Sequence, residues 1–171
     1  VLRLGGTVTL FRGREEYVFY TKEEDFRGQT FARVRMRRRK TIFARWSYEE
    51  LPFTTELGKH WLPWMAVREL EANCRDEQNP KSFKCDSVYL DNHLQDHLGD
   101  DRTVIIVDCP EFETAYDKLD EIFLAGKTLL HEDSICRIYE GESKYLFYRG
   151  MRVTDLRKPS LFTYEMKDVT L

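Results

Sequence analysis

The stretch TVTLFRGREEYVFYTKEEDFRGQTFARVRMRRRK, residues 7–40, decides the fold. Apolar and polar residues alternate in three runs that Gly13 and Gly28 separate. Alternation with a period of two is typical of strands, and glycine supplies the positive φ of tight hairpin turns. The stretch therefore predicts consecutive antiparallel strands. Together with a fourth strand expected after them, these runs span residues 7–11, 16–20, 30–36 and 41–46.

The middle of the chain predicts helices and one buried strand. A helix is expected from Pro63, because proline is tolerated in a first helical turn and apolar residues recur at helical spacing after it. A second, shorter helix is expected over residues 87–98. Residues 103–107 form an apolar run typical of a buried strand, and Asp-Cys-Pro at 108–110 predicts a helix that runs towards Gly126.

The last third of the chain returns to alternating runs, separated by turn sequences that end in Gly141 and Gly150. Strands cluster at both ends of the chain and helices in the middle, which favours an antiparallel-rich fold over a doubly wound one. The predicted class is α+β, with antiparallel β meanders at both ends and two or three helices and a strand–helix unit between them. The strands expected in the last third span residues 135–140, 144–148, 151–156 and 161–171.

Length and composition indicate how the chain is organised. A chain of 171 residues fits one hydrophobic core, and 42% hydrophobic with 33% charged residues is typical of a packed interior under a charged surface. Residues 1–171 are therefore predicted to form a single globular domain. The chain begins at Val1 rather than at a methionine and ends at Leu171 inside an expected strand, so we expect it to be part of a longer protein.

Cysteine spacing and hydropathy bear on the compartment. No apolar run reaches the roughly 18 residues of a membrane-spanning helix, so no membrane span is predicted. The four cysteines include no C-x-x-C pair, and the N-terminal residues do not resemble a signal peptide. This predicts reduced thiols in an intracellular protein, cytoplasmic or nuclear. A disulfide between Cys74 and Cys85 in a secreted protein is the alternative, because these two cysteines flank a polar loop.

A basic run is the most unusual local feature of the sequence. Residues 33–45 contain seven cations and no acid; removing these charges from the net charge of −3 leaves −10 for the rest of the chain. Such segregation creates a positive potential that attracts acidic or phosphate-rich partners, and Phe31, Phe43 or Trp46 could stack on bases. Three interpretations stay open: a solvated or internally paired face, a nucleic-acid or phosphate site, and a site for an acidic protein. The cations are Arg33, Arg35, Arg37, Arg38, Arg39, Lys40 and Arg45.

Two histidines suggest a divalent metal site as a further hypothesis. His93 and His97 lie one helical turn apart, and Asp100 or Asp101 follows after one further turn, so that His93, His97 and a carboxylate such as Asp101 could ligate one ion. Leu94 occupies the position at which a zinc protease helix carries its acid. Solvated histidines on the polar side of a helix are the favoured alternative, and no other cofactor is predicted.

Cys109 is a candidate nucleophile, because it precedes an expected helix start, where the helix dipole favours a thiolate. His60 or His131 would then act as the base. The carboxylates of Asp108 and Glu111 oppose thiolate formation, and a packing or capping role for the cysteine is favoured. No catalytic residue is assigned. The sequence also lacks the Walker A, dinucleotide-binding, nucleophile-elbow and EF-hand motifs.

These observations rank three functions. The first is a noncatalytic interaction or regulatory domain of a larger intracellular protein, in which the basic run lies opposite an acidic helix over residues 111–124. Its partner would be another protein or the rest of the parent chain. The second is nucleic-acid or phosphate binding through residues 33–45. The third is a metal-dependent enzyme that uses His93 and His97.

Overall fold

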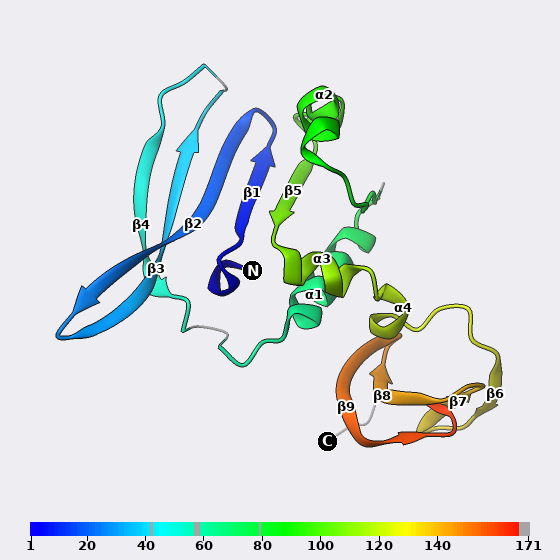
Figure 1. The fold of residues 1–171 in the computed structure, drawn as a ribbon. Coiled ribbons are helices and arrows are strands. Elements are labelled where there is room, and N and C mark those ends of the chain that lie inside the picture. The colour runs from blue at the N-terminus through cyan, green and yellow to red at the C-terminus, as the bar shows by residue number, and fades with distance from the viewer. Residues whose placement is uncertain (42, 57–58, 79, 168–171) are drawn as a thin grey trace.

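The computed structural model describes residues 1–41, 43–56, 59–78 and 80–167; for Phe26 and Phe53 it describes the backbone but not the side chain. Within these residues, two five-stranded sheets flank a group of helices (Figure 1). The N-terminal sheet and the C-terminal sheet are formed from opposite ends of the chain, apart from the strand over residues 103–108, which joins the N-terminal sheet from the middle of the helical region. The predicted α+β class is confirmed.

The N-terminal sheet is antiparallel throughout and has the order β4-β3-β2-β1-β5. Gly13 and Gly28 adopt positive φ angles of 60° and 77° in its two tight turns, as the sequence predicts. Gly6 has a different reason to be glycine, because a Cβ there would lie 2.6 Å from the Asp108 carbonyl oxygen. The strands are β1 (Thr7–Arg12), β2 (Glu15–Phe26), β3 (Gln29–Arg39), β4 (Ser47–Thr54) and β5 (Thr103–Asp108).

The prediction of a strand over residues 41–46 is wrong for the described part of that range, which excludes residue 42. These residues form a connection held by a hydrogen bond from the Ala44 amide to the Thr41 carbonyl. The true fourth strand, β4, contains Pro52, which lies where the pairing with β3 shifts register. A proline is tolerated there because β4 is an edge strand and the shift leaves a backbone position unpaired.

The helices match the predicted starts but not every predicted length. The sequence-predicted helix from residue 110 towards Gly126 is interrupted at Asp117 and Lys118. It also ends early, because Phe123 forms a β-bridge with Met151, which draws the backbone into the C-terminal sheet. The structure has α1 (Pro63–Arg75), α2 (Ser87–His97), α3 (Pro110–Tyr116), α4 (Leu119–Ile122) and the short helix η1 (Leu2–Leu4).

The main hydrophobic cluster lies among the helices, between the two sheets. Trp64 and Val67 of α1 pack with Ile122 and Phe123 at the end of α4, and all four are buried. Met151, the first residue of β9 (Met151–Ser160), packs against this cluster. The cluster therefore packs the helices against the first residue of β9 and so links them to the C-terminal sheet.

The C-terminal sheet has the order β6-β7-β10-β8-β9, so its last strand lies at its centre. β10 pairs antiparallel with β7 and parallel with β8. Four of these strands, β7 to β10, occupy the predicted runs, whereas β6 was not predicted. Residues 168–171 of the predicted final strand lie outside the described residues. Besides β9, the strands are β6 (Leu129–Glu132), β7 (Cys136–Tyr139), β8 (Ser143–Tyr148) and β10 (Thr163–Met166).

The chain exposes more surface than a compact protein of its mass. Its accessible area is 12526 Å², whereas a folded monomer of 20.5 kDa exposes about 8900 Å². Several large apolar side chains contribute to this excess, among them Phe43, Tyr48 and Val88. No helix among the described residues is long and apolar enough to span a membrane.

Candidate interaction surface

Four of the five arginines of β3 lie on one face of the N-terminal sheet, and most of these four are paired inside the molecule; Arg38 lies on the opposite face. Arg33 donates to Glu24 of β2 at 2.9 Å. Arg35 donates to Glu24 and to Glu50 of β4, both at 2.7 Å. The hydrogen bond from Arg35 lowers the pKa of Glu24, and the same bond raises the pKa of Arg35. These arginines are therefore largely neutralised by the neighbouring strands.

A tryptophan covers the end of the arginine row. The guanidinium carbons of Arg37 and Arg39 each lie 4.6 Å from the centre of the Trp46 ring. Arg39 also forms an ion pair with Glu16 of β2 at 2.5 Å. Trp46 thus folds back over the sheet and anchors the connection between β3 and β4, instead of standing free to stack on a base.

The remaining cations of the basic run, Arg38, Lys40 and Arg45, are exposed. They occur with two exposed aromatic side chains, Phe43 (93% exposed) and Tyr48 (69% exposed). All five residues belong to the end of β3, the start of β4 and the connection between them. The register pairs Arg37 with Tyr48 and Arg38 with Ser47, so Arg38 and Tyr48 lie on opposite faces of the sheet. We call the three residues of the connection itself, Lys40, Phe43 and Arg45, the β3–β4 patch.

The acidic helical segment is less acidic at its surface than its sequence suggests. Lys84, from the connection between α1 and α2, lies 2.8 Å from carboxylate oxygens of both Glu113 and Asp117. Hydrogen bonds to Asp117 and then Glu113 raise the pKa of Lys84. Glu121 accepts a hydrogen bond from the Tyr145 hydroxyl. Lys84 therefore neutralises part of the surface that the sequence predicts to be acidic.

The two histidines of α2 lie around a tyrosine. The ring of Tyr89 is 4.6 Å from that of His93 and 6.1 Å from that of His97, and its hydroxyl is 3.1 Å from His97 Nε2. His93 Nδ1 lies 3.4 Å from Asp96, while Asp101 is 88% exposed beside Arg102. Among the described residues no group of three or more histidine, cysteine or acidic side chains could hold a metal ion.

Cys109 is buried at the start of α3, where its thiol lies 3.4 Å from Glu111. Neither His60 nor His131 contacts it; His131 lies 3.6 Å from Asp133 instead. All four cysteines are free thiols, and the Cys74 thiol is 3.5 Å from the Lys81 carbonyl oxygen. The arrangement around Cys109 fits packing at the turn from β5 into α3.

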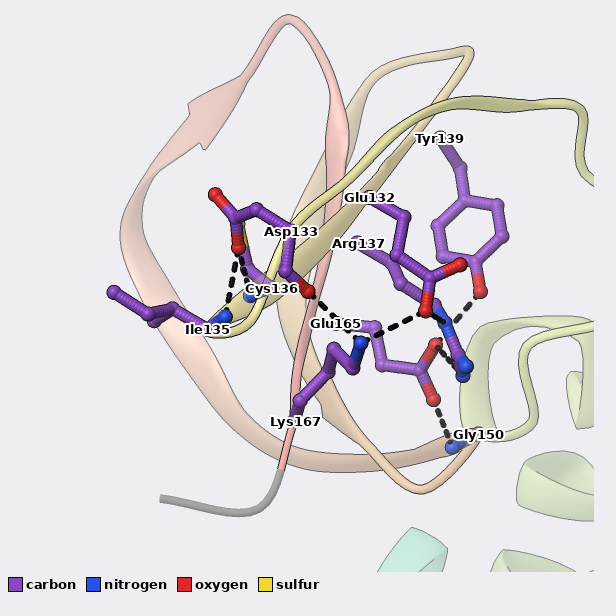
Figure 2. A network of polar contacts seen from close by, with 9 residues as sticks. All are labelled: Glu132, Asp133, Ile135, Cys136, Arg137, Tyr139, Gly150, Glu165 and Lys167. Carbon is purple, nitrogen blue, oxygen red and sulfur yellow. Dashed lines mark hydrogen bonds and ion pairs between the residues drawn. The ribbon is translucent and has the colours of Figure 1, made fainter.

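A buried polar network in the C-terminal sheet escaped the sequence analysis (Figure 2). Glu165 of β10 is 4% exposed and accepts hydrogen bonds of 2.7 Å from the Tyr139 hydroxyl and from the Gly150 amide. Arg137 lies 3.5 Å from the same carboxylate. Burial, followed by the hydrogen bond to Glu165, raises the pKa of Tyr139 to about 12. The network joins β7, β10 and the turn between β8 and β9.

The outer part of this network lies nearer the solvent. Lys167 bonds Glu132 at 2.8 Å, and Arg137 bonds the same carboxylate at 3.0 Å. Hydrogen bonds from Lys167 and then Arg137 lower the pKa of Glu132. Asp133 accepts bonds from the amides of Cys136 and Ile135, which lower its pKa. These contacts hold the turn between β6 and β7, so their role is structural.

A second buried cation joins the helices to the C-terminal sheet. Arg152 of β9 is 6% exposed, and its guanidinium carbon lies 4.1 Å from the Trp64 ring centre and 3.7 Å from that of Tyr145. Asp155 accepts from Arg152 Nη2 at 2.5 Å. In the sequence Arg152 lies in an alternating run typical of a strand, a pattern that does not show its burial.

Fold and surface together define an α+β protein of two sheets, and among its described residues the most exposed large apolar side chain, Phe43, lies between exposed cations in the connection from β3 to β4. Comparisons with family models, with curated proteins and with solved structures find no match for this chain. The function is therefore argued from the geometry of the chain itself.

Proposed function

We propose that this chain is a noncatalytic interaction domain that binds an acidic protein surface through the β3–β4 patch. The observation that carries the proposal is the exposure of Phe43, which is 93%, between the exposed cations Lys40 and Arg45. Burying such a side chain contributes about 1.5–3 kcal/mol, and aromatic residues and arginine are enriched in protein interfaces. An aromatic anchor flanked by cations suits a partner with an apolar site inside an acidic surface.

The pairing within the basic run favours a protein partner over nucleic acid. Arg33, Arg35 and Arg39 are engaged by acids of the same sheet, which leaves few cations to follow a phosphate backbone. A single-stranded nucleic acid stacked on Phe43 is therefore the second candidate.

Two further observations support an interaction role. The accessible area of 12526 Å² exceeds that of a compact monomer, and a partner would cover part of the excess. The four free thiols suit a reducing, intracellular compartment. A regulatory role would follow if the partner is the rest of a parent chain.

The test measures binding of two labelled probes by fluorescence anisotropy across a salt series. One probe is a synthetic peptide of alternating glutamate and leucine, and the other is a single-stranded oligonucleotide. The peptide should bind at low salt, and Phe43→Ser should weaken it about tenfold or more, the effect of an interface hot spot. A double variant, Lys40→Ala with Arg45→Ala, should weaken binding most at low salt, because at high salt screening already suppresses the contribution of these two cations to binding.

Lys158→Ala is the matched control, since Lys158 is an exposed cation of the C-terminal sheet. It should leave peptide binding unchanged. Equal losses in the control and in the patch variants would show that net charge alone attracts the peptide. Tight, salt-dependent binding of the oligonucleotide with none of the peptide would replace this proposal with the nucleic-acid function.

A further inference from the structure

The two edges of the N-terminal sheet are built differently. β4 forms one edge and carries Glu49, Glu50 and Pro52, residues that hinder pairing with another strand. β5 forms the other edge and contains four consecutive β-branched apolar residues, 104–107, with no proline, glycine or lysine. Ile105 is 43% exposed, and no strand in the described part of the chain pairs with the outer side of β5. β5 is therefore an unprotected apolar edge.

The hairpin geometry shows which backbone groups β5 offers. The two-residue turn between β1 and β2 pairs Arg12 with Glu15, so even-numbered residues of β1 bond to β2 and odd-numbered ones face β5. In agreement, the Gly13 amide bonds to the Arg102 carbonyl at 3.4 Å. Odd-numbered residues of β1 pair with even-numbered residues of β5. The N–H and C=O groups of the odd-numbered residues of β5, namely Thr103, Ile105 and Val107, therefore point outward.

We infer that β5 is the contact between two copies of this chain, paired antiparallel about a two-fold axis at Ile105. This register brings outward groups opposite outward groups, with Ile105 facing Ile105 of the second copy and Thr103 facing its Val107. Shifting the register by one residue would place outward groups opposite residues already bonded to β1. Backbone geometry thus allows only this register and registers shifted from it by two residues or a multiple of two.

Charge selects one of these registers. With Ile105 at the axis, Arg102 of each copy lies opposite Asp108 of the other, which gives two cross-strand ion pairs. Both side chains are available: Arg102 is 57% exposed with its nearest acid, Asp101, at 4.0 Å, and Asp108 is exposed. A slip of two residues would place each charged residue opposite an apolar or like-charged one or opposite Pro110. The edge is therefore complementary to itself.

The exposed area permits such an assembly. The chain exposes 12526 Å², some 3600 Å² more than the area expected of a compact monomer, and a stable dimer buries roughly 600–1000 Å² per copy. The β5 edge shares no residue with the β3–β4 patch. Failure of this inference would therefore leave the proposed function untouched, and failure of the proposed function would leave this inference untouched.

Sedimentation velocity of the whole chain over a concentration series tests the inference, with the expectation of a monomer–dimer equilibrium. Ile105→Pro should yield a monomer at every concentration, because proline removes an outward N–H that the new contact needs. The monomer fold should persist, since that N–H has no partner within the sheet. Ile105→Thr is the matched control: it retains the N–H and β-branching and should still dimerise.

Charge reversal tests the register. Arg102→Asp and Asp108→Arg should each weaken the dimer at least about tenfold, and the double variant should restore it. A chain that is monomeric throughout, or a dimer that survives Ile105→Pro, would overturn the inference. If circular dichroism shows that the proline variant does not fold, the charge variants provide the test instead. A double variant that does not recover the dimer would then contradict the proposed contact, in which Arg102 lies opposite Asp108. Binding of an unrelated extended peptide at this edge by a monomeric chain would also overturn it.

Discussion

Glu165 is a buried carboxylate whose two oxygens each accept a hydrogen bond, one from the Gly150 amide and one from the Tyr139 hydroxyl. In Glu165→Gln, an amide NH₂ must face one of these donors, which leaves that donor unsatisfied. We expect a loss of about 1–3 kcal/mol in the free energy of unfolding, the cost of an unpaired buried polar group. Urea denaturation measures the loss.

The matched control is Glu132→Gln, the same substitution at the accessible end of the network, where the side chain is 38% exposed. Water can replace its lost partners, so the loss should stay below about 1 kcal/mol. Equal losses at the two positions would contradict the role assigned to burial at Glu165.

Glu165→Gln should also change an alkaline titration. Burial and the Glu165 carboxylate raise the pKa of Tyr139 from 10.0 to about 12. The neutral phenol therefore stabilises the fold below pH 10, and this stabilisation is lost as the pH rises from 10 to 12. In the variant the effect of the carboxylate disappears while burial remains, so the pKa should fall but stay above its ordinary value. Tyrosinate absorbance, with Tyr139→Phe to identify the signal, measures the change.

Among the elements, α2 has the least support from the rest of the protein. None of its residues is buried, Val88 is 65% exposed, and its histidines contact Tyr89 of the same helix. Its amides should therefore exchange with solvent through local opening, far faster than those of α1, whose Val67 is fully buried. Hydrogen–deuterium exchange with mass spectrometry compares the two helices directly.

The loss of stability on truncating one side chain in each helix should show the same difference between α2 and α1. Leu94→Ala on α2 should cost less than about 1 kcal/mol, whereas Val67→Ala on α1 should cost about 2 kcal/mol through lost burial and a cavity. Comparable protection and comparable losses would mean that α2 is as well anchored as α1.

The sequence predicts an element well where one local pattern is enough. Apolar spacing identified α1 and α2, and the apolar run at 103–107 identified β5. β4 escaped because Glu49, Glu50 and Pro52 mask its alternation, and pairing with β3 overrides that local preference. The early end of α4 at Ile122 escaped because its cause, the bridge from Phe123 to Met151, joins residues far apart in the sequence.

The composition of the candidate surface could be predicted from the sequence, but which of its side chains are exposed could not. Residues 33–45 are visibly basic, yet which cations remain exposed depends on strand register. Only the pairing of β2 with β3 shows that Glu16 lies opposite Arg39, and only the fold of the connection places Trp46 over two arginines. The exposure of Phe43 follows from the same connection, so no local pattern could reveal it.

For the molecule as a whole, Arg152 couples the C-terminal sheet to the helices. Its guanidinium lies between the rings of Trp64 and Tyr145, and its carbonyl accepts a bond from Arg68 of α1 at 2.9 Å. Arg152→Lys replaces the planar cation with one that cannot stack on both rings. We expect a loss of about 2 kcal/mol and partial uncoupling of the two sheets.

Uncoupling is measured by following urea unfolding with tryptophan fluorescence and with hydrogen exchange in the C-terminal sheet. The two transitions should coincide in the parent chain and separate in the variant. Arg157→Lys, an exposed position on the same strand, is the control and should leave the transitions coincident. Coincident transitions in Arg152→Lys would show that the hydrophobic cluster alone joins the helices to the C-terminal sheet.

The central position of β10 has a consequence for synthesis on the ribosome. β6–β7 and β8–β9 emerge first, and each pair alone is a two-stranded ribbon, which is marginal in water. Neither the buried Glu165 nor the parallel pairing with β8 exists until residues 163–166 have left the exit tunnel. The C-terminal sheet must therefore assemble after translation of its last strand. Until then the nascent chain exposes two unsatisfied strand edges that attract chaperones or neighbouring chains.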